Sequence, residues 1–272
     1  MARHKEGRPV KAYENPDFLG SGEGRALRIM AEYLEPRSRF QHHRIDDTIV
    51  FMGSARAVPR EQAEAELAEA EAGGGDLEKA RGRLRMSAYY EAARDLAHRL
   101  TDWSKGLEDK DRRFVVCSGG GPGLMEATNR GASEAQGINV GLGISLPQEQ
   151  HGNPYITREL DFHFHYFFMR KFWFAYPAKA MVFLPGGFGT MDELFEILTL
   201  VQTGKMRKRL PIVLLGTEYW DRVMNLEAMV EWGAIDRSDL ELIHRTDSVD
   251  DAFDFLVREL TTHSMSSPGA SL

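Results

Sequence analysis

The sequence has few of the features that mark secreted, membrane or disulfide-bonded proteins. Its 272 residues contain one cysteine, Cys117, so an internal disulfide is excluded and a reducing compartment is indicated. No apolar run reaches the roughly 18 residues of a membrane span, and residues 1–17 lack the apolar core of a signal peptide. We therefore expect a soluble cytoplasmic protein with no membrane partner.

Positive charge is also in short supply. The chain has 34 Lys and Arg against 41 Asp and Glu, which gives a formal net charge of −7. Non-specific binding to nucleic acid requires basic clusters that displace counterions, so we expect no nucleic-acid partner. An anionic ligand would be held by local positive groups rather than by the field of the whole protein.

What the sequence does contain is a regular alternation of short apolar runs and helical patterns. The runs typical of buried parallel strands lie at residues 48–52, 114–117, 138–146, 160–166, 180–184, 211–215 and 242–245. The alternation predicts an α/β fold with a Rossmann-like, doubly wound, mostly parallel sheet. We expect one domain over residues 46–262, after an N-terminal arm and helix (1–45) and before a disordered tail (263–272). The helix over residues 23–34 is expected to end at Pro36.

Three of the predicted strands end in turns of small residues. Glycine also serves ordinary tight turns, but three such turns in one α/β chain can direct backbone N–H groups toward one crevice at the carboxyl edge of the sheet. N–H groups at the start of a helix attract anions. These turns predict a phosphate-bearing substrate. The candidate binding residues are Gly53, Ser54, Gly120, Gly121, Gly186, Gly187, Gly189 and Thr190.

Two charged residues, Arg170 and Glu193, flank the third of these strands. A glutamate at a strand's carboxyl edge is a candidate catalytic carboxylate, and an arginine can hold a carboxylate or hydroxyls with its planar fork. Each also has a plainer interpretation. Residues 190–193 (TMDE) have the pattern of a capping box, in which Glu193 would bond back to the backbone of Thr190. Arg170 could likewise be an ordinary surface arginine without a role in a site.

The residues around these turns match a known family. The run PGGFGTMDE (185–193) resembles the PGGxGTxxE motif of the LONELY GUY (LOG) family, cytokinin riboside 5′-monophosphate phosphoribohydrolases that are often mislabelled lysine decarboxylases. Residues 169–171 resemble the family's upstream arginine motif, and GGGPGLMEA (119–127) resembles its other glycine motif. Residues 145–157 look like the longer bacterial members, including nucleotide 5′-monophosphate nucleosidases. The likeness covers roughly residues 48–245.

The resemblance implies hydrolysis of the N-glycosidic bond of a nucleoside 5′-monophosphate, such as a cytokinin riboside monophosphate or AMP, to free base and ribose 5-phosphate. It implies Glu193 and Arg170 as catalytic residues, and it adds Lys171 to the substrate-binding residues. The chemistry agrees, because cleavage builds positive charge on the ribose, which a nearby carboxylate can stabilise while it orients or deprotonates water. The resemblance also implies a homodimer or a larger even-numbered assembly, with no cofactor.

Other functions remain as alternatives. The same fold and glycine motifs resemble molybdenum-cofactor carrier proteins, which hold a phosphorylated pterin without turnover. No lysine has a setting that suggests a pyridoxal phosphate Schiff base, so lysine decarboxylation is not expected. We expect no metal site, since His163 and His165 share a strand face without a third ligand at a convincing spacing.

Two further sets of residues have both a structural and a binding interpretation. The aromatic run over residues 167–176 is typical of core, although it could stack on a purine. The cations Lys205, Arg207, Lys208 and Arg209 follow the C-terminus of a predicted helix, where positive charge suits the helix dipole, and phosphate binding is the alternative.

Overall fold

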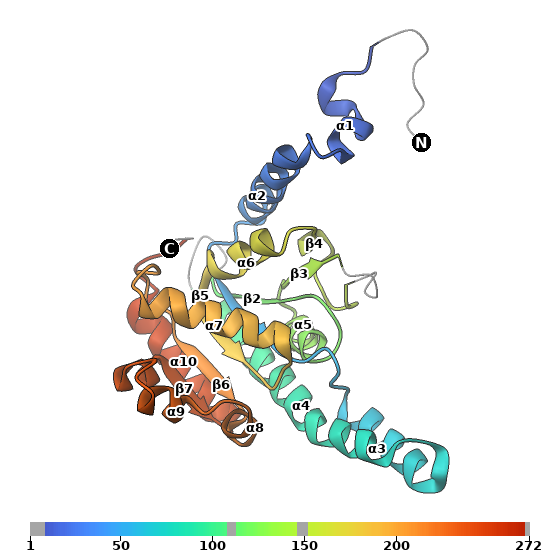
Figure 1. The fold of residues 1–272 in the computed structure, drawn as a ribbon, viewed down its shortest axis with the longest axis vertical. Coiled ribbons are helices and arrows are strands. Elements are labelled where there is room, and N and C mark those ends of the chain that lie inside the picture. Colours follow the sequence, from blue (N-terminus) through green and yellow to red (C-terminus); the bar gives the residue numbers. More distant parts are fainter. Residues whose placement is uncertain (1–8, 108–112, 146–151, 270–272) are drawn as a thin grey trace.

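The computed structural model describes residues 9–107, 113–145 and 152–269. In these ranges seven parallel strands form one sheet in the order β4-β3-β2-β1-β5-β6-β7 (Figure 1). The strands are β1 (Thr48–Met52), β2 (Val115–Ser118), β3 (Val140–Ile144), β4 (Asp161–Phe164), β5 (Ala178–Phe183), β6 (Ile212–Leu215) and β7 (Ile243–Thr246). The predicted α/β class is confirmed. Strand order reverses at β1, so the switch point at which such sheets bind ligands lies between β1 and β5.

Helices cover both faces of the sheet. The α-helices are α1 (Pro16–Gly20), α2 (Arg25–His42), α3 (Arg60–Glu69), α4 (Leu77–Lys105), α5 (Leu124–Glu134), α6 (Phe167–Ala175), α7 (Phe188–Gln202), α8 (Thr217–Val223), α9 (Leu226–Glu231) and α10 (Val249–His263). Short 3₁₀ helices are η1 (Ala12–Glu14), η3 (Arg158–Leu160) and η4 (Arg237–Leu242), and η2 (Ala70–Gly74) is a π-helical turn. None of the helices in the described ranges is both long and apolar enough to span a membrane.

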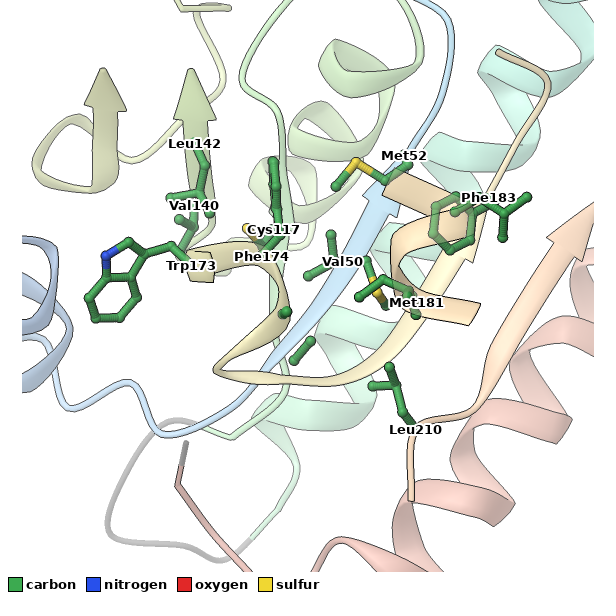
Figure 2. Packing of buried hydrophobic residues seen from close by; sticks show 14 of the residues in the cluster. Val50, Met52, Cys117, Val140, Leu142, Trp173, Phe174, Met181, Phe183 and Leu210 are labelled. Atoms are coloured by element: carbon green, nitrogen blue, oxygen red, sulfur yellow. The ribbon is translucent and has the colours of Figure 1, made fainter. Parts of the chain in front are cut away.

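Alternate residues of the central strand face two separate hydrophobic cores, as the period of a strand requires. Val50 and Met52 belong to one core and Ile49 and Phe51 to the other. Figure 2 shows the first core, where Phe174 of α6 lies beside Cys117 and Trp173 lies beside Val140. The aromatic run therefore serves partly as core. Its buried members are Met169, Trp173, Phe174 and Ala175, whereas Phe167 and Phe168 remain about half exposed.

The expectation that Pro36 ends the first long helix is wrong. Helix α2 continues to His42 with Pro36 buried inside it. Proline lacks the N–H that would bond to the carbonyl four residues earlier, which is that of Glu32. Here the indole Nε1 of Trp173 donates to that carbonyl oxygen at 3.0 Å. The helix tolerates the proline because a side chain from α6 replaces the missing donor.

Helices α3 and α4 form a hairpin that extends beyond the body of the molecule (Figure 1). The turn between them holds Gly73 at φ 88°, and the Asp76 side chain caps α4 by accepting from the N–H of Lys79. Along α4 the large buried side chains begin at Tyr90, while in the first turns Ala80 is the buried residue. The first turns of α4 therefore stand away from the core.

The amino edge of the sheet is closed by buried charges and by the end of the chain. Asp47 is fully buried; it pairs with Arg113 and lies 3.6 Å from the ammonium of Lys179. Arg113 donates to the carbonyls of Ser264 and Met265, and Lys179 donates to that of Ser267 at 2.8 Å. The expected disorder of residues 263–272 does not hold for 264–269, because buried donors need these carbonyls. Residues 270–272 lie outside the described ranges.

Removal of residues 264–272 should destabilise the fold. The truncated chain would leave the buried guanidinium of Arg113 and the ammonium of Lys179 without their carbonyl acceptors, and each unsatisfied buried donor costs about 1–3 kcal/mol. We expect the free energy of unfolding in urea to fall by about 2–5 kcal/mol on this scale. A chain that ends at Gly269 keeps all of these bonds and serves as the control. Equal stability of the two truncated chains would contradict this role of the tail.

Candidate functional site

The carboxyl ends of β1 and β5, the two strands at the switch point, open into a cleft of about 1030 Å³. Residues that follow these strands line most of it, and the first turns of α4 add a further wall. Its lining consists of Met52, Gly53, Ser54, Ala55, Arg56, Lys79, Gly82, Arg83, Met86, Met125, Arg170, Gly186, Gly187, Phe188, Gly189, Thr190, Met191, Glu193, Tyr219 and Val223.

The glycine turn after β5 leads directly into helix α7. Gly187 is the N-cap, and no side chain caps the helix. The first N–H groups of a helix have no intrahelical acceptor, so this end attracts an anion. A side chain at Gly186 would collide with Thr190, whereas nothing lies within 4 Å of the positions that side chains at Gly187 and Gly189 would take. Gly186 is therefore needed by the turn, and the other two keep the cleft open in front of the helix.

The turn after β1 forms the facing wall and is fixed to the glycine turn. The N–H of Ser54 donates to the carbonyl of Pro185 at 3.0 Å, and the carbonyl of Ser54 accepts from the N–H of Leu124 at 2.9 Å. The hydroxyl of Ser54 accepts from the N–H of Arg56 at 3.1 Å. Gly53 and Ser54 thus line the cleft opposite α7, where the sequence predicts them.

Arg170 and Glu193 meet in this cleft. The guanidinium Nη1 of Arg170 lies 3.4 Å from the carboxylate Oε1 of Glu193. Arg170 also donates from Nε to the carbonyl of Leu142 at 2.7 Å, and its guanidinium lies over the ring of Phe174. Its side chain is 11% exposed, so the alternative of an ordinary surface arginine is excluded.

Glu193 is buried, with 7% of its surface exposed. Burial raises the pKa of its carboxyl, and the charge of Arg170 acts in the opposite direction. The capping-box alternative fails, because the N-cap of α7 is Gly187 and Glu193 lies six positions further along. A buried carboxylate with a raised pKa beside a cation is typical of a functional site.

Gly119, in the turn after β2, gives Arg170 the space that it occupies. A Cβ atom at this position would lie 2.7 Å from Nη2 of Arg170 and 2.6 Å from the sulfur of Met125. Contacts this short would require the guanidinium of Arg170 and the thioether of Met125 to shift. The second glycine turn therefore contributes to the site by positioning the arginine.

The next two glycines of that turn, Gly120 and Gly121, are not among the residues that line the cleft. The N–H of Gly120 donates to the hydroxyl of Ser118, and the side-chain amide of Asn153 donates to the carbonyls of both glycines. Asn153 in turn donates to Asn129 at 2.9 Å. This part of the turn therefore belongs to a buried polar network. The glycine-rich sequence alone does not distinguish such a turn from a loop that faces a ligand.

Lys171 also lies outside the cleft lining. Its ammonium pairs with the carboxylates of Asp192 at 2.7 Å and Glu196 at 2.9 Å. It lines a neighbouring groove of about 630 Å³ together with Phe168, Phe188, Met191, Asp192, Phe195, Glu196, Thr199 and Leu200. Both carboxylates belong to helix α7, which holds the ammonium in this position.

The residues that the sequence did not indicate come from the α3–α4 hairpin. Lys79, Gly82, Arg83 and Met86 line the cleft, as does Arg56 after β1. The pattern of residues 60–85, rich in Ala, Glu and Arg, is that of a solvated helix, and it carries no signal that one face of α4 overhangs the switch point. This placement follows from the tertiary fold.

The remaining sequence candidates lie elsewhere. The cations after α7 are not in the cleft lining, and Lys208 donates to the carbonyls of Ala175 and Tyr176, just before β5 begins. His163 and His165 are exposed beside the edge strand β4. Within the described ranges, no group of three or more His, Cys, Asp or Glu side chains is arranged to hold a metal ion. Residues 146–151, within the stretch that resembles the longer bacterial proteins, lie outside these ranges.

Comparison with known proteins gives matches in sequence and in fold. Residues 125–256 match a family model described as "Possible lysine decarboxylase". The chain is 30% identical over 155 residues to the probable cytokinin riboside 5′-monophosphate phosphoribohydrolase LOG6 of Arabidopsis thaliana, covering 55% of this chain and 70% of that protein. It is 28% identical over 165 residues to LOG3 of the same plant, a cytokinin riboside 5′-monophosphate phosphoribohydrolase, covering 58% and 70%.

Two solved structures are similar at lower identity. The X-ray structure of TM1055 has a TM-score of 0.48 and 21% identity, and the match covers 78% of this chain and 99% of that one. The molybdenum cofactor binding protein from the phototrophic bacterium Rippkaea orientalis has a TM-score of 0.47 and 14% identity, with coverage of 79% and 95%.

The raised pKa of Glu193 predicts how Glu193→Gln changes stability with pH. Because the folded-state pKa exceeds the unfolded value, the carboxyl stabilises the fold below the unfolded pKa and loses that contribution as pH rises through the folded pKa. Glutamine does not titrate. The stability of the variant relative to the wild type should therefore increase between about pH 4 and pH 8, near and above the usual glutamate pKa. Urea unfolding across this range tests the sign. Glu231→Gln, at an exposed glutamate, should show no such trend.

Proposed function

This chain belongs to the LONELY GUY (LOG) family, and from that premise we propose that it hydrolyses the N-glycosidic bond of a nucleoside 5′-monophosphate. The products would be the free base and ribose 5-phosphate. One observation carries the proposal: the buried carboxylate of Glu193 lies beside Arg170 in a cleft that also contains the uncapped start of α7. A cation-stabilising group and an anion-binding group thus share one site.

The start of α7 is the proposed binding site for the 5′-phosphate. Its N–H groups and the hydroxyl of Thr190 can donate to phosphate oxygens, and the dipole of a 15-residue helix adds to this attraction. Gly187 and Gly189 leave space for the phosphate to approach the backbone. With a net charge of −7, the molecule as a whole would repel such a ligand, so these local groups supply the affinity.

The ribose would lie between this phosphate site and Glu193. As the bond between C1′ and the base nitrogen breaks, positive charge develops on the ribose ring, and the buried carboxylate stabilises it more strongly than an exposed one could. Water adds to C1′ and gives one proton to Glu193, while the bonding electrons leave with the base. The base takes up a proton from solvent, and Glu193 then returns its proton to solvent, which restores the carboxylate. Arg170 keeps the carboxylate in place through the 3.4 Å pair and is itself held by the carbonyl of Leu142.

Two other activities are less well supported by this geometry. A carrier of a phosphorylated pterin needs a phosphate site but has no need of a buried carboxylate such as Glu193. Lysine decarboxylation would need a lysine for a Schiff base. Burial lowers the pKa of Lys208 to about 7, but its Nζ bonds to Ala175 and Tyr176 at the start of β5, at the edge opposite the cleft.

The exposed aromatic groove supports a further proposal, that two copies associate. Phe188 is 96% exposed and shares the groove beside the cleft with Phe168 and Phe195, and large apolar patches rarely stay open on monomers. We propose a homodimer, or a larger even-numbered assembly, that covers this groove.

Light scattering at micromolar concentration should report at least twice the mass of one chain. Phe188→Asp should shift the measured mass toward that of the monomer, because it places a charge in the apolar groove. A monomeric wild type would contradict the proposal.

The 5′-phosphate should be required for turnover. We expect release of base and ribose 5-phosphate from one or more nucleoside 5′-monophosphates in a panel that includes AMP, a prenylated AMP and pyrimidine monophosphates. The matching nucleosides should react at least about 10²-fold more slowly in kcat/KM, because loss of charge-assisted bonds to the phosphate costs about 3 kcal/mol or more. Equal turnover of adenosine and AMP would contradict the role of α7.

Glu193→Gln should lower turnover by at least ~10²-fold, the lower end of what a positioned acid–base group contributes. Wild-type activity should rise with pH through a midpoint above the usual pKa of a glutamate, because the carboxylate is the active form and burial raises its pKa. Glu196→Gln, one turn further along α7 and outside the cleft, is the control. A folded Glu193→Gln protein that retains more than about a tenth of wild-type activity would favour the carrier alternative.

A further inference from the structure

The proposed reaction leaves one wall of the cleft without a role. This wall is formed by the first turns of α4, where Lys79, Gly82, Arg83 and Met86 line the cleft. Their spacing of three, four and seven residues places them on one face of the helix. The adjacent turn after β1 adds Arg56. We name Arg56, Lys79 and Arg83 the hairpin cations.

The cleft lining has an excess of positive charge although the whole chain is negative. Four cations and one carboxylate line it, and Arg170 already pairs with that carboxylate, Glu193. Within the described ranges, no carboxylate lies within ion-pair distance of the charged groups of Arg56 and Lys79. The guanidinium of Arg83 pairs with Glu66 of α3, which anchors it at the hairpin. Arg56 and Lys79 therefore provide positive charge that the nucleotide monophosphate site does not use, and Arg83, although paired, presents its guanidinium beside them.

Gly82 is a second, independent sign that α4 faces a ligand. Glycine is among the least favourable residues inside a helix, and it is usually retained where a side chain would collide with a neighbour. Here a Cβ atom would meet nothing closer than the guanidinium of Arg85, at 3.9 Å. No packing contact requires the glycine. It leaves a bare stretch of helix between Lys79 and Arg83, open to the cleft.

We propose that this wall is a second phosphate subsite, and that the protein binds nucleoside 5′-diphosphates more tightly than monophosphates. The inference rests on the proposed function, in which the first phosphate lies at the start of α7. The hairpin cations donate charge-assisted hydrogen bonds to the terminal phosphate, and Gly82 lets that phosphate approach the helix. Among the described residues, a neutral base in this position would leave Arg56 and Lys79 with no anion at ion-pair distance, whereas Arg83 would keep its pair with Glu66. The cleft volume of about 1030 Å³ is at the upper end of the range for ligand sites and has room for the larger ligand.

The test is calorimetric titration of the full-length protein with AMP and with ADP, without divalent cations. The protein carries Glu193→Gln so that turnover does not deplete the ligand. We expect ADP to bind at least about fivefold more tightly than AMP, the scale of one well-formed exposed charge pair. Lys79→Gln and Arg83→Gln should each reduce this ratio by about threefold or more, and the double variant should bring it close to one.

Two further variants separate the subsite from general effects. Gly82→Leu places a good helix former at the bare position, so the unfolding temperature should stay the same or rise while the ADP-to-AMP ratio falls. Arg81→Gln removes a cation from the same helix, at a position outside the cleft lining that pairs with Glu78, and should change neither affinity. The Gly82 variant tests the space without altering charge.

The outcomes are distinct. A wild-type ratio near one, or an equal loss of AMP and ADP affinity in the Lys79 and Arg83 variants, would refute a second subsite. A ratio that falls in these variants and in Gly82→Leu, but not in Arg81→Gln, would support it. If no nucleotide releases its base in the wild-type protein while this pattern of affinities persists, the proposed hydrolysis fails and the phosphate subsite stands.

Discussion

The buried pair of Arg170 and Glu193 is stable only if the surrounding elements compensate for the cost of removing both charges from water. Removal of two charges from water costs several kcal/mol per ion unless good geometry and further hydrogen bonds compensate. Here the compensation comes from different parts of the chain, because β3 supplies the carbonyl of Leu142, α6 the ring of Phe174 and the turn after β2 the space at Gly119. The pair is therefore possible only where these elements and α7 converge, beside the switch point of the sheet.

The two edges of the sheet treat buried charge differently. At the amino edge, Asp47, Arg113 and Lys179 are enclosed, and the carbonyls of the chain's end accept from the two cations. At the carboxyl edge, Glu193 lines an open cleft, with its cationic partner at 3.4 Å. The first arrangement is closed and stabilises the fold, whereas the second leaves the carboxylate accessible to a ligand. Burial raises the pKa of both Asp47 and Glu193, so the open cleft, rather than the pKa shift, distinguishes Glu193 as the candidate catalytic carboxylate.

Much of the fold could be predicted because its signals are local. Each predicted strand is present, and the glycine turns after β1 and β5 line the cleft, since apolar runs and small-residue turns are legible in sequence. The errors came from contacts between distant segments. Pro36 lies within α2 because Trp173, far along the chain, bonds to the carbonyl of Glu32. Likewise no periodic pattern in the sequence indicates that the hairpin reaches the cleft.

The glycines of the cleft fall into two kinds that a sequence cannot separate. At Gly119 and Gly186 a side chain would collide with Arg170 or Thr190, so these glycines are required by the packing of the site itself. At Gly187 and Gly189 a side chain would meet no protein atom within 4 Å, yet both lie where an anion would approach α7. A residue that no internal contact requires, at a position that lines a cleft, indicates space used by something other than the protein. Gly82 on α4, where a Cβ atom would come no closer than 3.9 Å to Arg85, resembles this second kind and supports the proposal that the hairpin shares a binding site with the glycine turns.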